Sequence, residues 1–260
     1  MSIRVTDEAL ALRAANLGVR YRAPKRTSLV ALANVSVDVR RAEIVGVVGE
    51  SGSGKSTLGK CLAGFLKPDS GTVTVHGGAG RRKIRVQMIF QESAMALDPR
   101  MPIWKSVAEA LSTGRSIGKD LRPQVQESLS SVGLGPELMF RLPSEISGGQ
   151  RQRVAIARAI ASGANVIVCD EAVSALDASV RARVLELIVR LRHERSLAFV
   201  FISHDISVVA QISDRVVVMK KGEIVEQGAT QEVIYHPRHP YTQALMAAVP
   251  RLQADQLRAG

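Results

Sequence analysis

Aromatic residues are scarce in this chain, at 3% of its 260 residues, and only two cysteines occur. A surface that stacks nucleic-acid bases needs aromatic side chains, so we expect no nucleic-acid partner. Cys61 and Cys169 both lie within apolar patterns, which predicts buried thiols. A disulfide framework would require more cysteines and an oxidising compartment, so cysteine usage indicates the cytosol.

Long hydrophobic runs are also lacking, and we expect no signal peptide. No uninterrupted apolar stretch approaches the roughly 18 residues that a membrane-spanning helix requires. The first thirty residues contain Asp7, Glu8 and scattered arginines instead of an apolar block followed by a cleavage site. Hydrophobic residues nevertheless make up 46% of the chain, which predicts one aliphatic domain over residues 1–260.

Lysine and arginine outnumber the acidic residues by 35 to 24, and the formal net charge is +11. Such an excess suits nucleic acid, an anionic membrane surface or a nucleotide as partner. The basic residues are dispersed, and their densest cluster is Arg81, Arg82, Lys83 and Arg85. For any one cluster, a solvated face is the simpler interpretation.

Segments that read as strands alternate with segments that read as helices along most of the chain. In residues 35–40, valines alternate with polar residues, as in a half-buried antiparallel strand of an N-terminal β subdomain. Short apolar runs at 43–48, 165–169 and 197–203 are typical of buried strands. Residues 92–163 carry helical patterns and are predicted to form an inserted helical subdomain. We therefore expect an α/β fold with a mostly parallel sheet and helices on both faces.

The stretch "GESGSGKST" at residues 49–57 matches the phosphate-loop pattern G-x-x-x-x-G-K-[ST]. A buried strand precedes it and a helix follows, which is the context that the pattern requires. Its glycines let the backbone wrap a β-phosphate, Lys55 reaches the β- and γ-phosphate oxygens, and the Ser56 hydroxyl ligates Mg²⁺. Thr57 could bond the α-phosphate. The loop predicts a P-loop NTPase that binds a nucleoside triphosphate with Mg²⁺.

Polar side chains follow three buried strands at the point where each strand ends. Asp170 and Glu171 end "VIVCDE", Gln91 follows "VQMIF", and His204 follows "FVFIS". Open α/β sheets place their sites at this carboxyl edge. Asp170 is expected to help Ser56 hold the metal, while Glu171 can turn toward the γ-phosphate at the end of its strand and orient water.

A second glycine-rich helix start, "ISGGQRQRVAIARAIA", begins at Ile146. A serine cap, bare backbone N–H groups and the helix dipole all favour an anion there. The chain therefore has two predicted phosphate sites about ninety residues apart.

These features together resemble the ATP-binding cassette (ABC) ATPases over about residues 12–230. The resemblance rests on the Walker A phosphate loop, Gln91 as the Q-loop, "ISGGQ" as the signature, "VIVCDE" as Walker B, "SALD" at 174–177 as the D-loop, and His204 as the switch histidine. The signature is the most specific of these motifs, because P-loop proteins in general lack it.

The resemblance implies that each of the two phosphate sites serves a different nucleotide. In this family two nucleotide domains dimerise head to tail, and the signature of one closes over the ATP held by the other. Glu171, His204 and Gln91 would be catalytic, with Glu171 as general base or water-positioning residue. Gln91 would also join Ser56 and Asp170 at the Mg²⁺. The expected nucleotide contacts are Tyr21 stacked on adenine, Gly49, Glu50, Ser51, Gly52, Ser53, Gly54, Lys55, Ser56, Thr57, Ser147, Gly148, Gly149, Gln150 and the D-loop residue Asp177.

A finer resemblance is to the ATPases of oligopeptide, dipeptide and nickel importers. It rests on "QESAMALDPRM" from Gln91, on "DEAVSALD", and on "HPRHPYTQALMAAVP" at 236–250, within a tail over about 230–260. It implies a second ATPase subunit (the same or a related chain), two transmembrane permease subunits and an extracytoplasmic substrate-binding protein. The chain would lie at the cytoplasmic face of the membrane as a peripheral subunit. Without the resemblance, the tail is only a terminal amphipathic helix.

Two other functions stay open at this point. One is the ATPase of an ABC exporter, and the other is a soluble ABC protein that acts on DNA or ribosomes. Ribosome-acting members usually carry two cassettes, and DNA-repair members carry long coiled-coil or zinc insertions. This chain has one cassette and room for a short helical insert, which favours a transporter.

Overall fold

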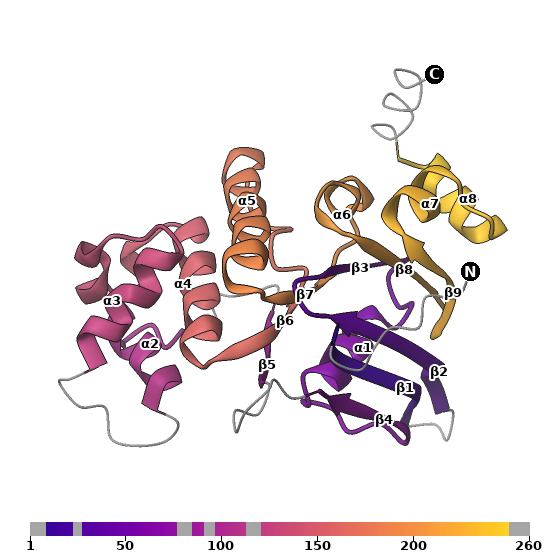
Figure 1. The fold of residues 1–260 in the computed structure, drawn as a ribbon, viewed down its shortest axis with the longest axis horizontal. Helices are drawn as coiled ribbons and strands as arrows, with labels where there is room; N and C mark the ends of the chain where they lie inside the picture. Colours follow the sequence, from indigo (N-terminus) through magenta and orange to yellow (C-terminus); the bar gives the residue numbers. More distant parts are fainter. Residues whose placement is uncertain (1–8, 23–27, 77–84, 91–96, 113–120, 250–260) are drawn as a thin grey trace.

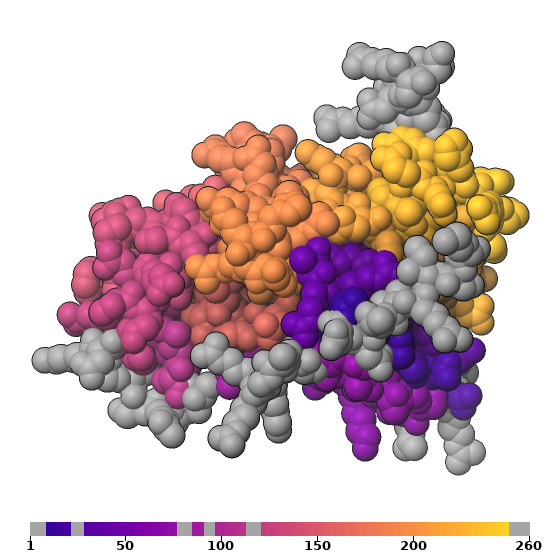
Figure 2. All heavy atoms as spheres, viewed as in Figure 1, coloured from indigo at the N-terminus to yellow at the C-terminus, as the bar shows by residue number. Residues whose placement is uncertain are grey.

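The computed structural model describes residues 9–22, 28–76, 85–90, 97–112 and 121–249. Figure 1 shows a central sheet, a smaller sheet below it, a helical part at one end and the C-terminal helices at the other. The same division is visible on the surface in Figure 2, where the magenta helical part and the yellow C-terminal part lie at opposite ends.

Six strands form the larger sheet, namely β3 (Ile44–Val48), β5 (Arg85–Ile89), β6 (Ala164–Asp170), β7 (Ala198–Ile202), β8 (Arg215–Lys220) and β9 (Glu223–Ala229). Their spatial order is β5-β6-β7-β3-β8-β9, and all neighbours are parallel except β8 and β9. Every residue of β3 and β7 is buried, as expected for strands covered on both faces. The predicted mostly parallel sheet is confirmed.

The smaller sheet is antiparallel and consists of β1 (Leu10–Arg22), β2 (Ser28–Arg40) and β4 (Ser70–Val75), in the order β2-β1-β4. Val35, Val37 and Val39 are buried, whereas Ser36 and Arg40 are exposed, so the predicted period of two is present. This sheet is the expected N-terminal antiparallel part of the fold.

The two faces of the larger sheet pack into two separate cores. Along β6, Val166 and Val168 join the core formed with the small sheet and helix α1 (Lys55–Leu62). Ile167 and Cys169 join the core formed with the helices on the other face, which are α4 (Gly148–Ala161), α5 (Ala178–Arg195) and α6 (Ile206–Ile212). Cys61 and Cys169 are buried free thiols, and burial raises their pKa to about 11 and about 12.

The helical part lies between β5 and β6 in the chain. It contains α2 (Ile103–Ser112), α3 (Arg122–Ser131), two short 3-10 helices over Pro136–Phe140 and Pro143–Glu145, and α4. These helices agree with the inserted helical segment predicted from the sequence. Its predicted start at residue 92 lies outside the described residues.

The C-terminal helices α7 (Thr230–Tyr235) and α8 (Pro240–Ala247) follow β9 directly. Pro240 occupies the first turn of α8, where a missing N–H costs nothing, and the His239 side chain caps the helix. Among the described helices, none is both long and apolar enough to cross a membrane.

Candidate functional site

The phosphate loop leads from the end of β3 into the first turn of α1. Gly54 caps α1 with φ +105°, and a Cβ at this position would lie 2.5 Å from the carbonyl oxygen of Ala31. Gly49 has φ +149°, and its Cβ would lie 2.2 Å from the Met219 carbonyl oxygen. Both positions therefore require glycine, because they combine a left-handed backbone with close contact to neighbouring chain.

Lys55 is buried at the mouth of this loop, with 7% of its surface exposed. Its Nζ donates to the carbonyl oxygens of Gly49 and Glu50, each at 2.8 Å. Burial lowers the pKa of Lys55, and the nearby carboxylates of Glu171, Asp170 and Glu50 act in the opposite direction. The ammonium is thus held by neutral carbonyl oxygens that phosphate oxygens can replace.

Ser56 and Asp170 form a pair of oxygen ligands beside Lys55. The Ser56 Oγ donates to Asp170 Oδ1 at 3.0 Å, which joins the first turn of α1 to the end of β6. Burial raises the pKa of Asp170, the Ser56 hydrogen bond lowers it, and the Glu171 charge raises it further. Hydroxyl and carboxylate oxygens are suitable ligands for Mg²⁺.

Glu171 leaves the strand direction at the point where β6 ends. It has φ +51°, and its N–H still donates to the Ile202 carbonyl oxygen at 3.0 Å. The carboxylate therefore turns toward the end of β7, where its Oε2 lies 3.0 Å from His204 Nδ1. A non-glycine residue in this backbone region is strained, and such strain is often found at active sites.

One pocket collects most of the nucleotide contacts predicted within a single chain. Tyr21 lies at its rim, 40% exposed, with its hydroxyl 3.4 Å from Thr57 Oγ1. Sequence reasoning missed the contribution of β2, because nothing in the local pattern of residues 29–31 indicates a ligand. The pocket is lined by Tyr21, Leu29, Val30, Ala31, Ser51, Gly52, Gly54, Lys55, Ser56, Thr57, Glu171 and His204.

The second glycine-rich segment lies at the start of α4, outside the lining of that pocket. Ser147 Oγ accepts from the Gln150 N–H at 3.2 Å, and Gln150 Oε1 accepts from the Ser147 N–H at 2.8 Å. The predicted serine cap is confirmed, and Gln150 completes a capping box. A Cβ on Gly149 would lie 2.2 Å from Val180 Cγ1 in α5. A Cβ on Gly148 would meet no atom closer than 3.7 Å.

The remaining candidates lie at helix starts or outside the described residues. Asp177 caps α5 by accepting from the Val180 N–H at 2.9 Å, and this hydrogen bond lowers its pKa. Asp205, which sequence reasoning missed, caps α6 and pairs with Arg181 at 3.3 Å. Its signal was present, because an aspartate that precedes an apolar helical pattern is a typical N-cap. Gln91 lies outside the described residues.

Family comparison matches two regions of the chain. Residues 32–174 match the ABC transporter family, and residues 225–259 match the oligopeptide/dipeptide transporter C-terminal region. The first region contains the phosphate loop, the start of α4 and the Asp170–Glu171 pair. The second contains α7 and α8.

Curated relatives cover most of the chain. The probable D,D-dipeptide transport ATP-binding protein DdpF of Escherichia coli is 44% identical over 223 residues, 85% of this chain and 71% of that protein. The oligopeptide transport ATP-binding protein OppF of Streptococcus mutans is 40% identical over 246 residues, 90% of this chain and 80% of that protein. The glutathione import ATP-binding protein GsiA of E. coli is 42% identical over 98% of this chain, which spans 43% of GsiA.

Solved structures share the fold. A dimeric structure of MJ0796, a bacterial ABC transporter cassette, is 28% identical with a TM-score of 0.73, covering 84% of this chain and 98% of that one. MJ0796 has also been solved as a dimer bound to ADP and Pi. The structure of cbiO1 from Clostridium perfringens, part of the ABC transporter complex cbiONQ, is 25% identical with a TM-score of 0.75, covering 96% of this chain and 100% of that one.

These matches fit the geometry of the site, in which a phosphate loop, an aspartate that ends β6, the glutamate directly after it and a histidine after β7 meet at one edge of a mostly parallel sheet. The chain belongs to the ABC transporter family as an ATP-binding domain of the ATPases that power transport, and it carries the oligopeptide/dipeptide transporter C-terminal region.

Proposed function

We propose that this chain binds and hydrolyses ATP to power an importer of peptides or nickel-type ligands. The observation that carries the proposal is the meeting of Lys55, the Ser56–Asp170 pair and the Glu171–His204 pair at one pocket edge. The C-terminal match at residues 225–259 supports an importer of the peptide class.

ATP would occupy the pocket with its phosphates on the loop and its adenine beside Tyr21. Lys55 would exchange the carbonyl oxygens of Gly49 and Glu50 for β- and γ-phosphate oxygens. The backbone N–H groups of the loop and the start of α1 favour the remaining negative charge. The exposed ring of Tyr21 offers a face for the base.

Ser56 and Asp170 would hold a Mg²⁺ ion, which supplies neutralisation of the phosphate charge when bound. Among the described residues, no group of three His, Cys, Asp or Glu side chains could hold a metal without further ligands. Nucleotide oxygens would complete the coordination of the metal, together with Gln91, which the family pattern places there.

Hydrolysis would use the pair after β6 and β7. Glu171 would accept a proton from the attacking water or orient that water, and His204 would hold the carboxylate and contact the γ-phosphate. Because carboxylate and phosphate oxygens only accept hydrogen bonds, His204 must carry a proton on Nδ1 for the Glu171 contact and a second proton on Nε2 to donate to the γ-phosphate.

A partner domain would complete each site. Ser147 and Gly149 would bind the γ-phosphate held by the partner, and Asp177 would connect the two chains at the D-loop. The start of α4 supports this arrangement, because its cap fixes the helix end while the segment stays outside its own pocket. The dimeric structures of MJ0796, a protein of similar fold, also support this arrangement. The partner would be a second copy of this chain or a related one.

The complete importer would include two transmembrane permease subunits and an extracytoplasmic substrate-binding protein. The chain would act at the cytoplasmic face of the membrane as a peripheral subunit. The relatives DdpF, OppF and GsiA, named for D,D-dipeptide, oligopeptide and glutathione transport, support a peptide-like substrate.

The test is peptide-dependent ATP hydrolysis by the assembled transporter in vesicles. The chain, the permeases encoded beside it and the neighbouring binding protein would be reconstituted and supplied with ATP and candidate peptides. We expect uptake that the Lys55→Ala variant abolishes and that the exposed control Lys60→Ala, on the same helix, retains. The proposal of an importer would be contradicted by ATP-dependent export of the peptide. It would also be contradicted by an ATP hydrolysis rate that is the same with and without the permeases.

A further inference from the structure

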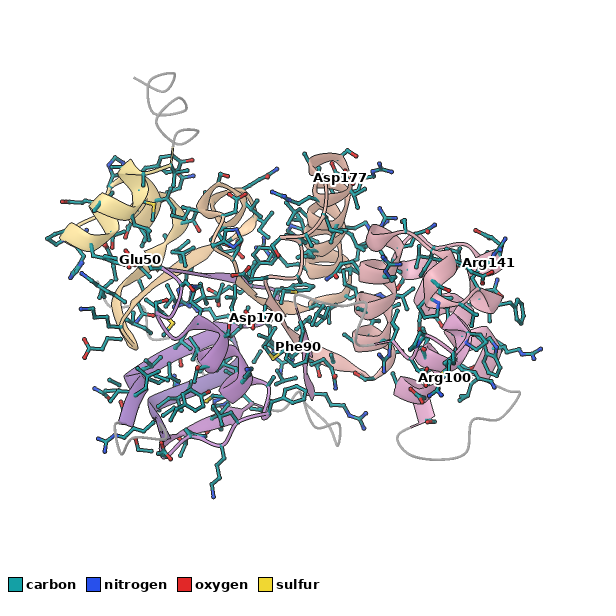
Figure 3. All side chains as sticks on the ribbon, turned by 180° about the vertical axis from the view of Figure 1, so that it is seen from behind. Glu50, Phe90, Arg100, Arg141, Asp170 and Asp177 are labelled. Carbon is teal, nitrogen blue, oxygen red and sulfur yellow. The ribbon has the colours of Figure 1, made fainter. Side chains whose placement is uncertain are left out.

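The C-terminal helix α8 touches the phosphate loop. The N–H of Glu50 donates to the hydroxyl oxygen of Tyr241 at 3.1 Å, across 191 positions of sequence. Figure 3 labels Glu50 beside the yellow C-terminal helices. The contact joins the part of the chain that matches the oligopeptide/dipeptide transporter C-terminal region to the loop that would hold ATP.

Tyr241 is held in place through the backbone at the start of α8 and through its ring. Glu226 in β9 accepts from the N–H groups of Arg238 at 2.9 Å and His239 at 3.1 Å, which ties the start of α8 to the sheet. His239 Nδ1 accepts from the Tyr241 N–H at 3.1 Å. Lys220, at the end of β8, places its ammonium 4.5 Å from the centre of the Tyr241 ring. The residue is buried, with 8% of its surface exposed.

The other side of the contact is Glu50, whose carboxylate also hydrogen-bonds to the Tyr241 hydroxyl and whose N–H belongs to a planar peptide group. The N–H of Glu50 and the carbonyl of Gly49 belong to the same peptide unit, which moves as one rigid plane. Its N–H donates to Tyr241, and its carbonyl oxygen accepts from Lys55 Nζ at 2.8 Å. Tyr241 therefore acts on the orientation of a group that holds the loop lysine. Hydrogen bonds in such a chain also polarise one another.

We propose that Tyr241 is a positioning residue of the phosphate loop, through which docking of the C-terminal segment sets the affinity for nucleotide. The proposal rests on the proposed binding of ATP at Lys55. With the hydroxyl present, the Gly49–Glu50 peptide is held in the orientation that wraps the phosphates. Without it, the loop samples other orientations, and ATP binding must select the wrapped one from among them. Burial raises the pKa of Tyr241, so its phenol stays protonated and neutral at physiological pH.

The test is Tyr241→Phe in the full chain, because phenylalanine keeps the ring and its packing and removes only the hydroxyl. We expect the KM for ATP to rise about fivefold, the loss that corresponds to one ordinary hydrogen bond. The kcat at saturating ATP should stay within about twofold of wild type, because the phenol lies on the loop rather than at the reacting atoms. The matched control is Tyr235→Phe, whose ring lies beside α5 and α6 in a different pocket.

A second measurement is independent of ATP turnover. In the nucleotide-free wild type, the Glu50 amide should exchange its hydrogen at least about tenfold more slowly than in Tyr241→Phe, because the hydrogen bond protects it. An unchanged KM together with an unchanged Glu50 exchange rate would overturn the proposal, as would a fall in kcat with KM unchanged. If the wild type itself failed to bind ATP, the proposed function would fail, while the exchange comparison would still report whether the contact holds the loop.

Discussion

The Glu171 carboxylate and the His204 imidazole are hydrogen-bonded to each other, with 3.0 Å between Oε2 and Nδ1. One residue follows β6 and the other follows β7, so their contact depends on the parallel pairing of these two strands. The pair links the acid that would act on water to the residue that would contact the γ-phosphate.

Glu171→Gln should stop turnover and keep ATP binding. The amide cannot accept a proton, and we expect hydrolysis to fall by about 10² to 10⁴, the usual contribution of a general base. The ATP-bound dimer should then accumulate, which size-exclusion chromatography and a phosphate-release assay would measure together. Glu186→Gln, on the exposed side of α5, is the matched control. Hydrolysis near the normal rate would remove Glu171 from this role.

Ser147→Arg should block closure of the dimer while ATP still loads onto the variant's own loop. Mixing this variant with Lys55→Ala should restore up to about a quarter of wild-type hydrolysis, because half of the randomly paired two-fold dimers would contain one intact site out of two. Each variant alone should be inactive. Normal turnover of Ser147→Arg alone would show that the start of α4 does not act across the dimer. Where the chain pairs with a related cassette, the variants are assayed inside that assembled transporter.

Tyr21→Ala should weaken nucleotide binding by about 1–3 kcal/mol, the range for loss of one base–aromatic stack. Tyr21→Phe keeps the ring and loses only the contact with Thr57, so it should bind nearly as well as wild type. Fluorescent nucleotide titration would measure both. A large fall in kcat at saturating ATP, with the dissociation constant unchanged, would contradict the placement of adenine at this residue.

Asp170→Asn should stabilise the nucleotide-free chain at neutral and alkaline pH. Burial raises the folded-state pKa of Asp170 above its ordinary value of 3.8, so its ionised form opposes folding as the pH rises through the folded pKa. Below pH 3.8 the wild-type carboxyl is protonated in both states, and the gain in Tm from asparagine should vanish. Asp98→Asn is the control and should lower the Tm at neutral pH, because a backbone hydrogen bond from Arg100 lowers the pKa of Asp98 and so favours its ionised form in the folded chain. A Tm difference independent of pH would refute this account.

The sequence alone determined the local features of the site. The phosphate loop, the acidic residues at the end of β6 and the cap of α4 by Ser147 were all predicted from residues a few positions apart. Each follows from short-range physics: the backbone freedom of glycine, the end of a buried strand and a side-chain hydrogen bond to the next helical turn. The alternation of strands and helices likewise predicted the layers of the fold.

Only the tertiary structure decided which distant groups meet. Nothing in the local pattern indicated that Leu29, Val30 and Ala31 would line the pocket, or that Gly149 would meet Val180. The contact between Glu50 and Tyr241 spans 191 positions, and it exists because β9 anchors α8 beside the end of β3. Such contacts depend on how whole elements dock. Docking is set by the total apolar area that the elements bury against one another, and this area cannot be read from a local sequence pattern.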